Sequence, residues 1–157
     1  MKISDLYKIF NNHPNVTTDT RNIKENSIFF ALKGDNFNGN KFARKAIKDG
    51  CHYAIIDQAE FQLNEKYILV DDVLKCLQNL ATYHRDQIMI TVIGITGTNG
   101  KTTSKELIYS CLSTELNTLA TDGNYNNHIG VPLTLLRANK EHDIAIIEMG
   151  ANHENEI

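Results

Sequence analysis

The sequence predicts an α/β fold with mostly parallel strands, organised as a small first domain followed by the start of a second one. Three observations lead to this fold class: short apolar runs alternate with helix-like segments, a longer apolar run opens the second half, and a glycine-rich turn follows it directly. Strands and helices in regular alternation are typical of parallel sheets covered by helices. The change in character near residue 88 predicts domains at 1–87 and 88–157.

In the first domain, short segments rich in aromatic and β-branched residues predict strands at 27–32, 53–57 and 67–70. Between the first two strands, segment 41–49 has the periodicity of a helix, with an apolar face made of Phe42, Ala43, Ala46 and Ile47. A second helix is expected to begin at Asp71 and Asp72, where acidic side chains interact favourably with the helix dipole, and to end near Asp86.

The second domain opens with 88–96, a nearly continuous apolar run that suits a central parallel strand covered on both faces. A helix over 102–115 is expected after the glycine-rich turn, with an inward face made of Leu107, Ile108, Cys111 and Leu112. A strand at 117–121, a short helix within 128–138 and a strand at 143–149 continue the pattern. A doubly wound nucleotide domain has more strands than these, so we expect a domain truncated at Ile157, with a naturally small domain as the alternative.

Composition and charge argue against several classes of protein. The net charge is −3 and lysine and arginine form no run, which argues against a sequence-independent grip on nucleic acid. No apolar run approaches the roughly 20 residues that span a bilayer, and the N-terminus lacks the apolar core of a signal peptide. The three cysteines are far apart and have no metal-binding spacing, so we expect a reducing, cytoplasmic environment.

The strongest chemical signal is the segment Gly94-Ile-Thr-Gly97-Thr-Asn-Gly100-Lys101-Thr102-Thr103. Glycines let successive backbone N–H groups converge on an anion, and the start of a helix adds partial positive charge. The pattern predicts an ATP-binding phosphate loop in which Lys101 reaches the terminal phosphates and the Thr102 hydroxyl binds Mg²⁺. The other residues expected to contact the nucleotide are Gly97, Thr98, Asn99, Gly100 and Thr103. The strict pattern requires glycine at position 95, where this chain has Ile95.

A second candidate is Glu148, near the end of the strand predicted at 143–149. Open parallel sheets bind nucleotides outside the carboxyl ends of their strands, so a residue at this position can face the nucleotide. A carboxylate there can hold Mg²⁺, as the acid on the second strand of phosphate-loop enzymes does. An exposed glutamate at a strand end is the alternative.

At these residues the sequence resembles the Mur ligase family, whose loop spacing G-x-x-G-x-x-G-K-[ST] accommodates Ile95. The segments 123–136 (GNYNNHIGVPLTLL) and 148–153 (EMGANH) are similar to the branch of the family that adds D-alanyl-D-alanine. Asn155 stands where the family often has glycine.

The resemblance extends to the first domain. Segment 18–21 (TDTR) is similar to the family's T-D-S-R element, with Thr20 in place of serine. Segment 29–34 (FFALKG) together with Asn38 and Gly39 resembles the loop on the uridine-diphosphate side.

The resemblance implies an ATP- and Mg²⁺-dependent ligase of peptidoglycan precursor synthesis, of which this chain would be the front third, monomeric and inactive alone. ATP would phosphorylate the terminal carboxylate of a UDP-N-acetylmuramoyl-tripeptide, and the amine of D-Ala-D-Ala would attack the resulting acyl phosphate. Lys101 and Glu148 are the implied catalytic residues, and Thr102 and Glu148 the implied metal ligands.

Further site residues follow from the positions of the matched motifs. Thr20 and Arg21 would contact the UDP part, where a guanidinium group suits a diphosphate. Asn126 and Asn127 would lie near the nucleotide or the substrate, and we assign Asn127 to the nucleotide and Asn126 to the substrate. Turn formation is the alternative role for both asparagines. Asn152 and His153, just beyond the last predicted strand, are also candidates.

Three alternatives remain open at this stage. A sister ligase that adds a diamino acid or lysine, or a folylpolyglutamate-type relative, shares the loop but not the N-N-x-I-G-V-P stretch. A non-catalytic fragment that binds a nucleotide or a UDP-sugar is the second alternative. A generic phosphate-loop kinase or GTPase is the third, and it leaves the first domain unexplained.

Overall fold

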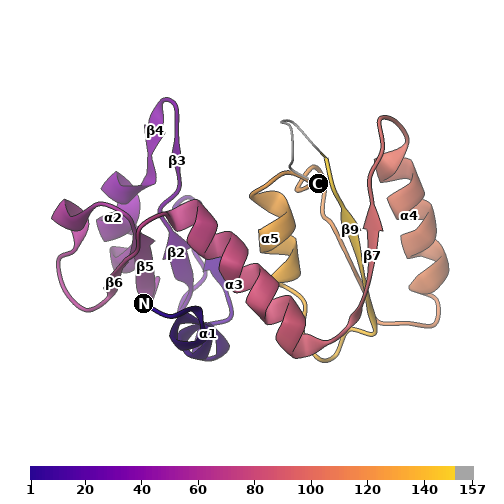
Figure 1. Cartoon of the computed structure of the whole chain (residues 1–157), viewed down its shortest axis with the longest axis horizontal. Helices are drawn as coiled ribbons and strands as arrows, with labels where there is room; N and C mark the ends of the chain where they lie inside the picture. Colours follow the sequence, from indigo (N-terminus) through magenta and orange to yellow (C-terminus); the bar gives the residue numbers. More distant parts are fainter. Residues whose placement is uncertain (151–157) are drawn as a thin grey trace. The chain divides into compact units, whose positions relative to one another are not determined.

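The computed structural model describes residues 1–150, and the chain divides into two compact units after Leu80. Each unit has its own parallel sheet with helices packed against it, as Figure 1 shows, which confirms the predicted α/β class. The division falls within helix α3 (Val73–Ile88). The domain boundary predicted at residues 87–88 lies at the end of this helix and stays a prediction. No helix within residues 1–150 is long and apolar enough to cross a membrane.

The first unit has a four-stranded parallel sheet in the order β1-β2-β5-β6. Its strands are β1 (Val16–Thr17), β2 (Ile28–Phe30), β5 (Tyr53–Ile56) and β6 (Tyr67–Leu69). Helix α1 (Ile3–Asn12) buries Leu6 and Phe10, and helix α2 (Ala43–Lys48) packs through Ala43 and Ala46 against the cluster containing Phe29. The strands predicted at 27–32, 53–57 and 67–70 are therefore confirmed.

An antiparallel hairpin of β3 (Lys33–Gly34) and β4 (Phe37–Asn38) leads into a 3-10 helix, η1 (Gly39–Phe42). A second 3-10 helix, η2 (Ala59–Phe61), follows β5. The prediction that Phe42 lies on the apolar face of a helix is wrong. Phe42 ends η1 before α2 begins, so its ring is 37% exposed and stacks on Phe37 with a centroid separation of 5.3 Å.

The second unit has a three-stranded parallel sheet in the order β7-β9-β8. Its strands are β7 (Thr91–Ile95), β9 (Ile144–Glu148) and β8 (Thr118–Ala120). Helices α4 (Lys101–Leu112) and α5 (Gly130–Leu135) cover opposite faces of this sheet (Figure 1). Side chains alternate between the faces of a strand, so Ala145 and Ile147 pack with the α5 cluster while Ile146 and Glu148 lie on the α4 side.

The prediction that 88–96 forms a central strand covered on both faces is wrong for the described part of the sheet. Strand β9 is the middle strand and all five of its residues are buried, whereas β7 is an edge strand with Thr91 and Gly94 exposed. The strand also starts later than predicted. Ile88 ends α3, and Met89 takes a left-handed conformation with φ of 54°, which breaks the apolar run into a helix end, a turn and a strand.

The inward face predicted for α4 is also wrong in part. Leu107 is 64% exposed and Cys111 is exposed, whereas the buried residue of this helix is Lys105. The helix turns the side that carries Lys105 toward the sheet, which leaves Leu107 and Cys111 on the outer side. Periodicity located the helix correctly and included the partly buried Ile108 and Leu112, but it placed Leu107 and Cys111 on the covered face and omitted Lys105.

Candidate functional site

The glycine-rich turn between β7 and α4 has backbone conformations at Gly97 and Gly100 that a side chain would disfavour. Gly97 has φ of 146° and Gly100 has φ of 76°, both in a region that residues with a Cβ rarely adopt. Gly100 is the N-cap of α4, and the intervening Thr98 and Asn99 are exposed. Nothing therefore covers this turn within residues 1–150, and the first amides of α4 are available to an anion.

Lys101 is the first residue of α4 and folds back over the turn. Its ammonium donates a hydrogen bond to the carbonyl oxygen of Gly97 at 2.6 Å. This contact holds a positive charge against the backbone of the loop. The arrangement can bind a phosphate group through one ammonium and several N–H donors.

Glu148, at the end of β9, is the acidic group next to this loop. Its side chain is 1% exposed, and Oε1 accepts hydrogen bonds from the Thr102 hydroxyl at 3.1 Å and from the Asn126 amide at 2.8 Å. The other oxygen, Oε2, is buried and has no hydrogen-bond partner among residues 1–150. Strand register explains the position, because Ile95 at the end of β7 pairs with Glu148.

A buried carboxylate oxygen without a hydrogen-bond donor is costly, and the residues around Glu148 would suit a cation. Mg²⁺ fits the residues present: it prefers oxygen ligands and is commonly held by one or two protein groups together with substrate phosphates. Thr102 and Glu148 provide two such oxygens beside the loop. Residues 1–150 contain no group of three or more His, Cys, Asp or Glu side chains suited to a metal.

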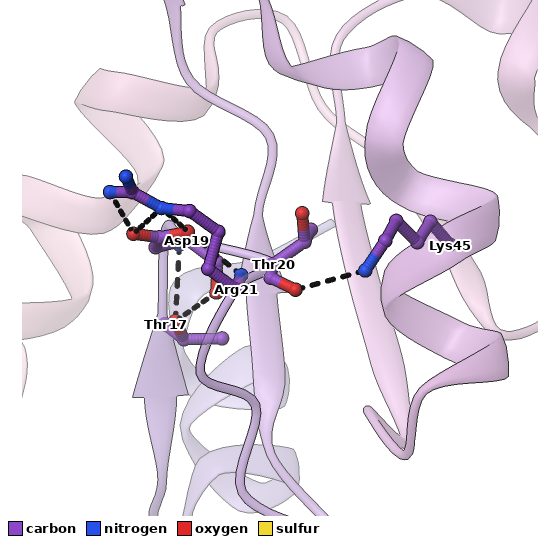
Figure 2. A network of polar contacts seen from close by, with 5 residues as sticks. All are labelled: Thr17, Asp19, Thr20, Arg21 and Lys45. Atoms are coloured by element: carbon purple, nitrogen blue, oxygen red, sulfur yellow. Dashed lines mark hydrogen bonds and ion pairs between the residues drawn. The ribbon is translucent and has the colours of Figure 1, made fainter.

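The first unit contains a separate pocket of about 430 Å³. Its lining residues are Thr18, Asp19, Thr20, Arg21, Phe29, Phe37 and Phe42. Arg21 lies against Asp19 at this pocket, with Nη2 donating to Oδ2 at 2.6 Å and the backbone N–H donating to Oδ1 at 2.8 Å (Figure 2). The hydrogen bonds from Arg21 lower the pKa of Asp19 below its ordinary value.

Two models of known protein families match this chain, and together they cover most of it. The model described as "Mur ligase family, catalytic domain" matches residues 14–85, and the model described as "Mur ligase middle domain" matches residues 95–156. The chain belongs to the Mur ligase family.

Two curated relatives that are similar to this chain share one protein name. The chain is 41% identical over 144 residues to the UDP-N-acetylmuramoyl-tripeptide–D-alanyl-D-alanine ligase of Bacillus subtilis, covering 90% of this chain and 32% of the relative. It is 43% identical over 142 residues to the Escherichia coli ligase of that name, covering 90% of this chain and 31% of the relative. The chain thus spans about a third of the length of the curated relatives that it matches.

Solved structures of this ligase type have the same fold. MurF from Acinetobacter baumannii superposes with a TM-score of 0.82 at 39% identity, covering 90% of this chain and 31% of that one. MurF ligase from Thermotoga maritima, solved in complex with ADP, superposes with a TM-score of 0.82 at 29% identity, covering 99% of this chain and 35% of that one.

In this Mur ligase chain, the two predicted site residues Asn126 and Asn127 differ in their contacts. Asn126 donates its amide to Glu148 and accepts the Gly150 N–H at its backbone oxygen at 2.7 Å, so it belongs to the carboxylate site. Asn127 uses its side-chain oxygen to accept the N–H groups of Ile129 and Gly130, at 3.1 and 2.8 Å, at the start of α5. Ligand contacts for both asparagines stay predictions.

For two predicted site residues, Thr103 and Thr20, the structure of residues 1–150 gives the position but no side-chain contact that points to a ligand. Thr103 is exposed on the first turn of α4, and Thr20 contributes its backbone oxygen to a hydrogen bond from the Lys45 ammonium at 3.0 Å (Figure 2). The candidates Asn152 and His153, and the departure at Asn155, lie outside the described residues.

Sequence reasoning missed three side chains next to these sites. Phe37 and Phe42 line the pocket of the first unit, although Phe42 was assigned to a helical face. Lys105 is 2% exposed on α4, where a lysine is ordinarily expected in solvent. The one available signal for Lys105 was its spacing, because a residue four positions after Lys101 lies on the same side of the helix.

Proposed function

We propose that this chain provides the nucleotide and UDP-substrate sites of an ATP-dependent ligase that joins D-Ala-D-Ala to UDP-N-acetylmuramoyl-tripeptide. The observation that carries the proposal is the buried Glu148 carboxylate beside the glycine loop. Its Oε1 accepts a hydrogen bond from Thr102, and its Oε2 has no hydrogen-bond partner within residues 1–150. Relatives named for this reaction are 41% and 43% identical to the chain, and a solved relative of the same type contains ADP.

The proposed reaction depends on neutralisation of the phosphate charges and needs no covalent catalysis by the protein. The carboxylate of the tripeptide attacks the γ-phosphorus of ATP, the bond to ADP breaks, and an acyl phosphate forms. The amine of D-Ala-D-Ala then attacks the acyl carbon, loses a proton to solvent, and inorganic phosphate leaves as the amide forms. Positioning and electrostatic stabilisation dominate catalysis of such phosphoryl transfer.

The residues around the glycine loop of the second unit each have a role in this scheme. The backbone amides at 97–100 and the ammonium of Lys101 bind the phosphates and stabilise charge that moves onto the leaving ADP. Thr102 and Glu148 hold Mg²⁺, which supplies further neutralisation of the phosphate oxygens when bound. Asn126 fixes the orientation of the Glu148 carboxylate through its 2.8 Å hydrogen bond.

In the first unit, the pocket beside Arg21 is the proposed site for the UDP part. Its volume of about 430 Å³ lies within the usual range for small-molecule pockets. The Arg21 side chain is 88% exposed, so its guanidinium group can turn from Asp19 toward a diphosphate with little loss of packing. We further propose that the protein acts in the cytoplasm, in agreement with three cysteines that are all free thiols.

The test is nucleotide binding by the 157-residue chain, measured by calorimetric titration with Mg·ATP. Binding is the appropriate readout because the chain spans about a third of its relatives' length. Lys101→Ala removes a charge-assisted hydrogen bond, for which about 1.5–3 kcal/mol is typical, so affinity should fall about 10- to 100-fold. The exposed Lys140 provides the control, and Lys140→Ala should leave the affinity unchanged. Equal affinity of Lys101→Ala and the wild-type chain would refute the nucleotide site.

A further inference from the structure

Lys105 is a buried charge that the proposed mechanism does not use. Its side chain is 2% exposed, and its ammonium donates to the carbonyl oxygen of Thr121 at 2.6 Å and lies 2.8 Å from Glu106 Oε1. A buried ammonium is costly unless both charge and hydrogen bonds are satisfied. The fold therefore holds this lysine in one place, at the end of β8.

Thr121 transmits this contact to Glu148. Its own N–H donates to Ile146 at 3.0 Å, and its hydroxyl oxygen accepts the backbone N–H of Glu148 at 2.9 Å. Thr121 is 1% exposed, so the hydrogen bond to Glu148 is shielded from water. Lys105 thus hydrogen-bonds the backbone carbonyl of Thr121, and Thr121 in turn hydrogen-bonds the backbone N–H of Glu148.

Helix α4 consequently meets the strand ends at two points. Thr102 donates to Glu148 Oε1, and Lys105, three positions later on the same side of the helix, donates to Thr121. Helix α4 also packs against β7, β8 and β9. The two hydrogen bonds, to the ends of two neighbouring strands, add specific polar contacts that orient the first turns of the helix relative to Glu148.

We propose that Lys105 is a positioning residue for the metal pair formed by Thr102 and Glu148. It keeps the Thr102 hydroxyl and the Glu148 carboxylate at the separation that one divalent cation requires, acting through Thr121 and touching neither nucleotide nor metal. This inference rests on the proposed function, because it assumes that the pair holds Mg²⁺ beside a bound nucleotide. Groups that orient metal ligands in this way typically change metal affinity about 10- to 100-fold when removed.

The experiment compares nucleotide binding with and without the metal. Lys105→Met keeps most of the side-chain volume and removes the ammonium, and Lys140→Met is the same change at an exposed position. Each variant of the 157-residue chain is titrated with Mg·ATP and, separately, with ATP in EDTA. We expect Lys105→Met to bind Mg·ATP about tenfold more weakly and to bind metal-free ATP within about twofold of wild type, with Lys140→Met equal to wild type in both.

A second variant covers the case in which Lys105→Met does not fold. Thr121→Val keeps the backbone carbonyl and the side-chain shape but removes the hydroxyl that accepts the Glu148 N–H, so the same loss confined to Mg·ATP is expected. Unchanged binding of Mg·ATP, or an equal loss with and without metal, overturns the inference, because a purely structural or electrostatic role predicts one of these. If the wild-type chain binds no Mg·ATP, the proposed function fails first and the inference with it.

Discussion

The hydroxyl of Thr102 donates a hydrogen bond to Glu148 Oε1 across 3.1 Å, although 46 positions separate the two residues. Thr102 lies in the first turn of α4 and Glu148 is the last residue of β9, so the parallel sheet brings together a helix start and a strand end. The second carboxylate oxygen is buried and unpartnered within residues 1–150. The folded chain thus bears an electrostatic cost at the position where the proposed cation site needs a negative charge.

This cost leads to the first prediction, which concerns Glu148→Gln. Glutamine keeps the shape of the side chain and its oxygen can still accept from Thr102 and Asn126, while the negative charge disappears. We expect the Mg²⁺ dependence of ATP binding to be lost and the free energy of unfolding without metal to rise by about 1 kcal/mol, because an unpaired amide is less costly to bury than an unpaired carboxylate. Calorimetric titration and urea unfolding followed by circular dichroism measure the two effects.

Glu148→Asp is the matched control for this prediction, because it keeps the charge and shortens the side chain. It should bind Mg·ATP more weakly than wild type but retain a response to Mg²⁺. A destabilised Glu148→Gln variant would mean that the carboxylate is mainly a structural group, contrary to the proposed metal site.

The sequence was sufficient to predict the strands β2, β5, β6, β7, β8 and β9 and the glycine-rich turn after β7, since each depends on a local pattern, whereas the two-residue strands β1, β3 and β4 were not predicted. The order of strands was not available from the sequence: 88–96 and 143–149 are both apolar runs, and only the fold makes β9 the middle strand of the described sheet. The covered face of α4 was likewise unpredictable, because burial of Lys105 depends on a carbonyl oxygen at Thr121 that is distant in sequence. Long-range hydrogen bonds have no local signature, which is why Lys105 was missed while Lys101 was found.

The second prediction compares two glycines of the first unit. A Cβ on Gly39 would lie 2.6 Å from the Ala31 carbonyl carbon and closer still to the Leu32 oxygen, so backbone atoms would have to move. A Cβ on Gly34 would meet nothing within 4 Å. We expect Gly39→Ala to lower the free energy of unfolding by about 2–3 kcal/mol and Gly34→Ala to change it by less than about 0.5 kcal/mol, measured by urea unfolding. Equal effects of the two substitutions would contradict the close packing of η1 on the segment before β3.

The third prediction concerns pH and His84, which is 5% exposed and whose Nε2 lies 2.7 Å from the Ala138 carbonyl oxygen. Burial lowers the pKa of His84 below its ordinary value of 6.5, despite the opposing effect of this hydrogen bond. The unfolded chain therefore takes up a proton at higher pH than the folded chain. Its contribution to stability is fully present above about pH 6.5 and is lost as the pH falls from there toward the lowered pKa.

Urea unfolding of the wild-type chain between pH 7.5 and 5 should accordingly show decreasing stability below about pH 6.5. His84→Gln should flatten this decline without abolishing it, because burial also lowers the pKa of His52. An unchanged slope in His84→Gln would show that His84 is not the group that takes up the proton on unfolding.

The fourth prediction addresses the pocket of the first unit and separates recognition of phosphate from recognition of the base. Arg21 holds Asp19 through its guanidinium group and lines the pocket, whereas Arg44 in α2 is exposed and does not line it. Arg21→Ala should weaken binding of UDP about tenfold, in line with the loss of a charge-assisted hydrogen bond, and leave binding of uridine nearly unchanged. Arg44→Ala should affect neither ligand.

Arg21→Lys distinguishes geometry from charge at this position. Lysine keeps the positive charge but lacks the planar fork that donates two aligned hydrogen bonds, so we expect UDP affinity between that of wild type and that of Arg21→Ala. Calorimetric titration of the four chains with UDP and with uridine provides the comparison. If Arg21→Ala weakened uridine and UDP equally, Arg21 would act by holding the pocket open through Asp19, and the diphosphate would be bound by other side chains.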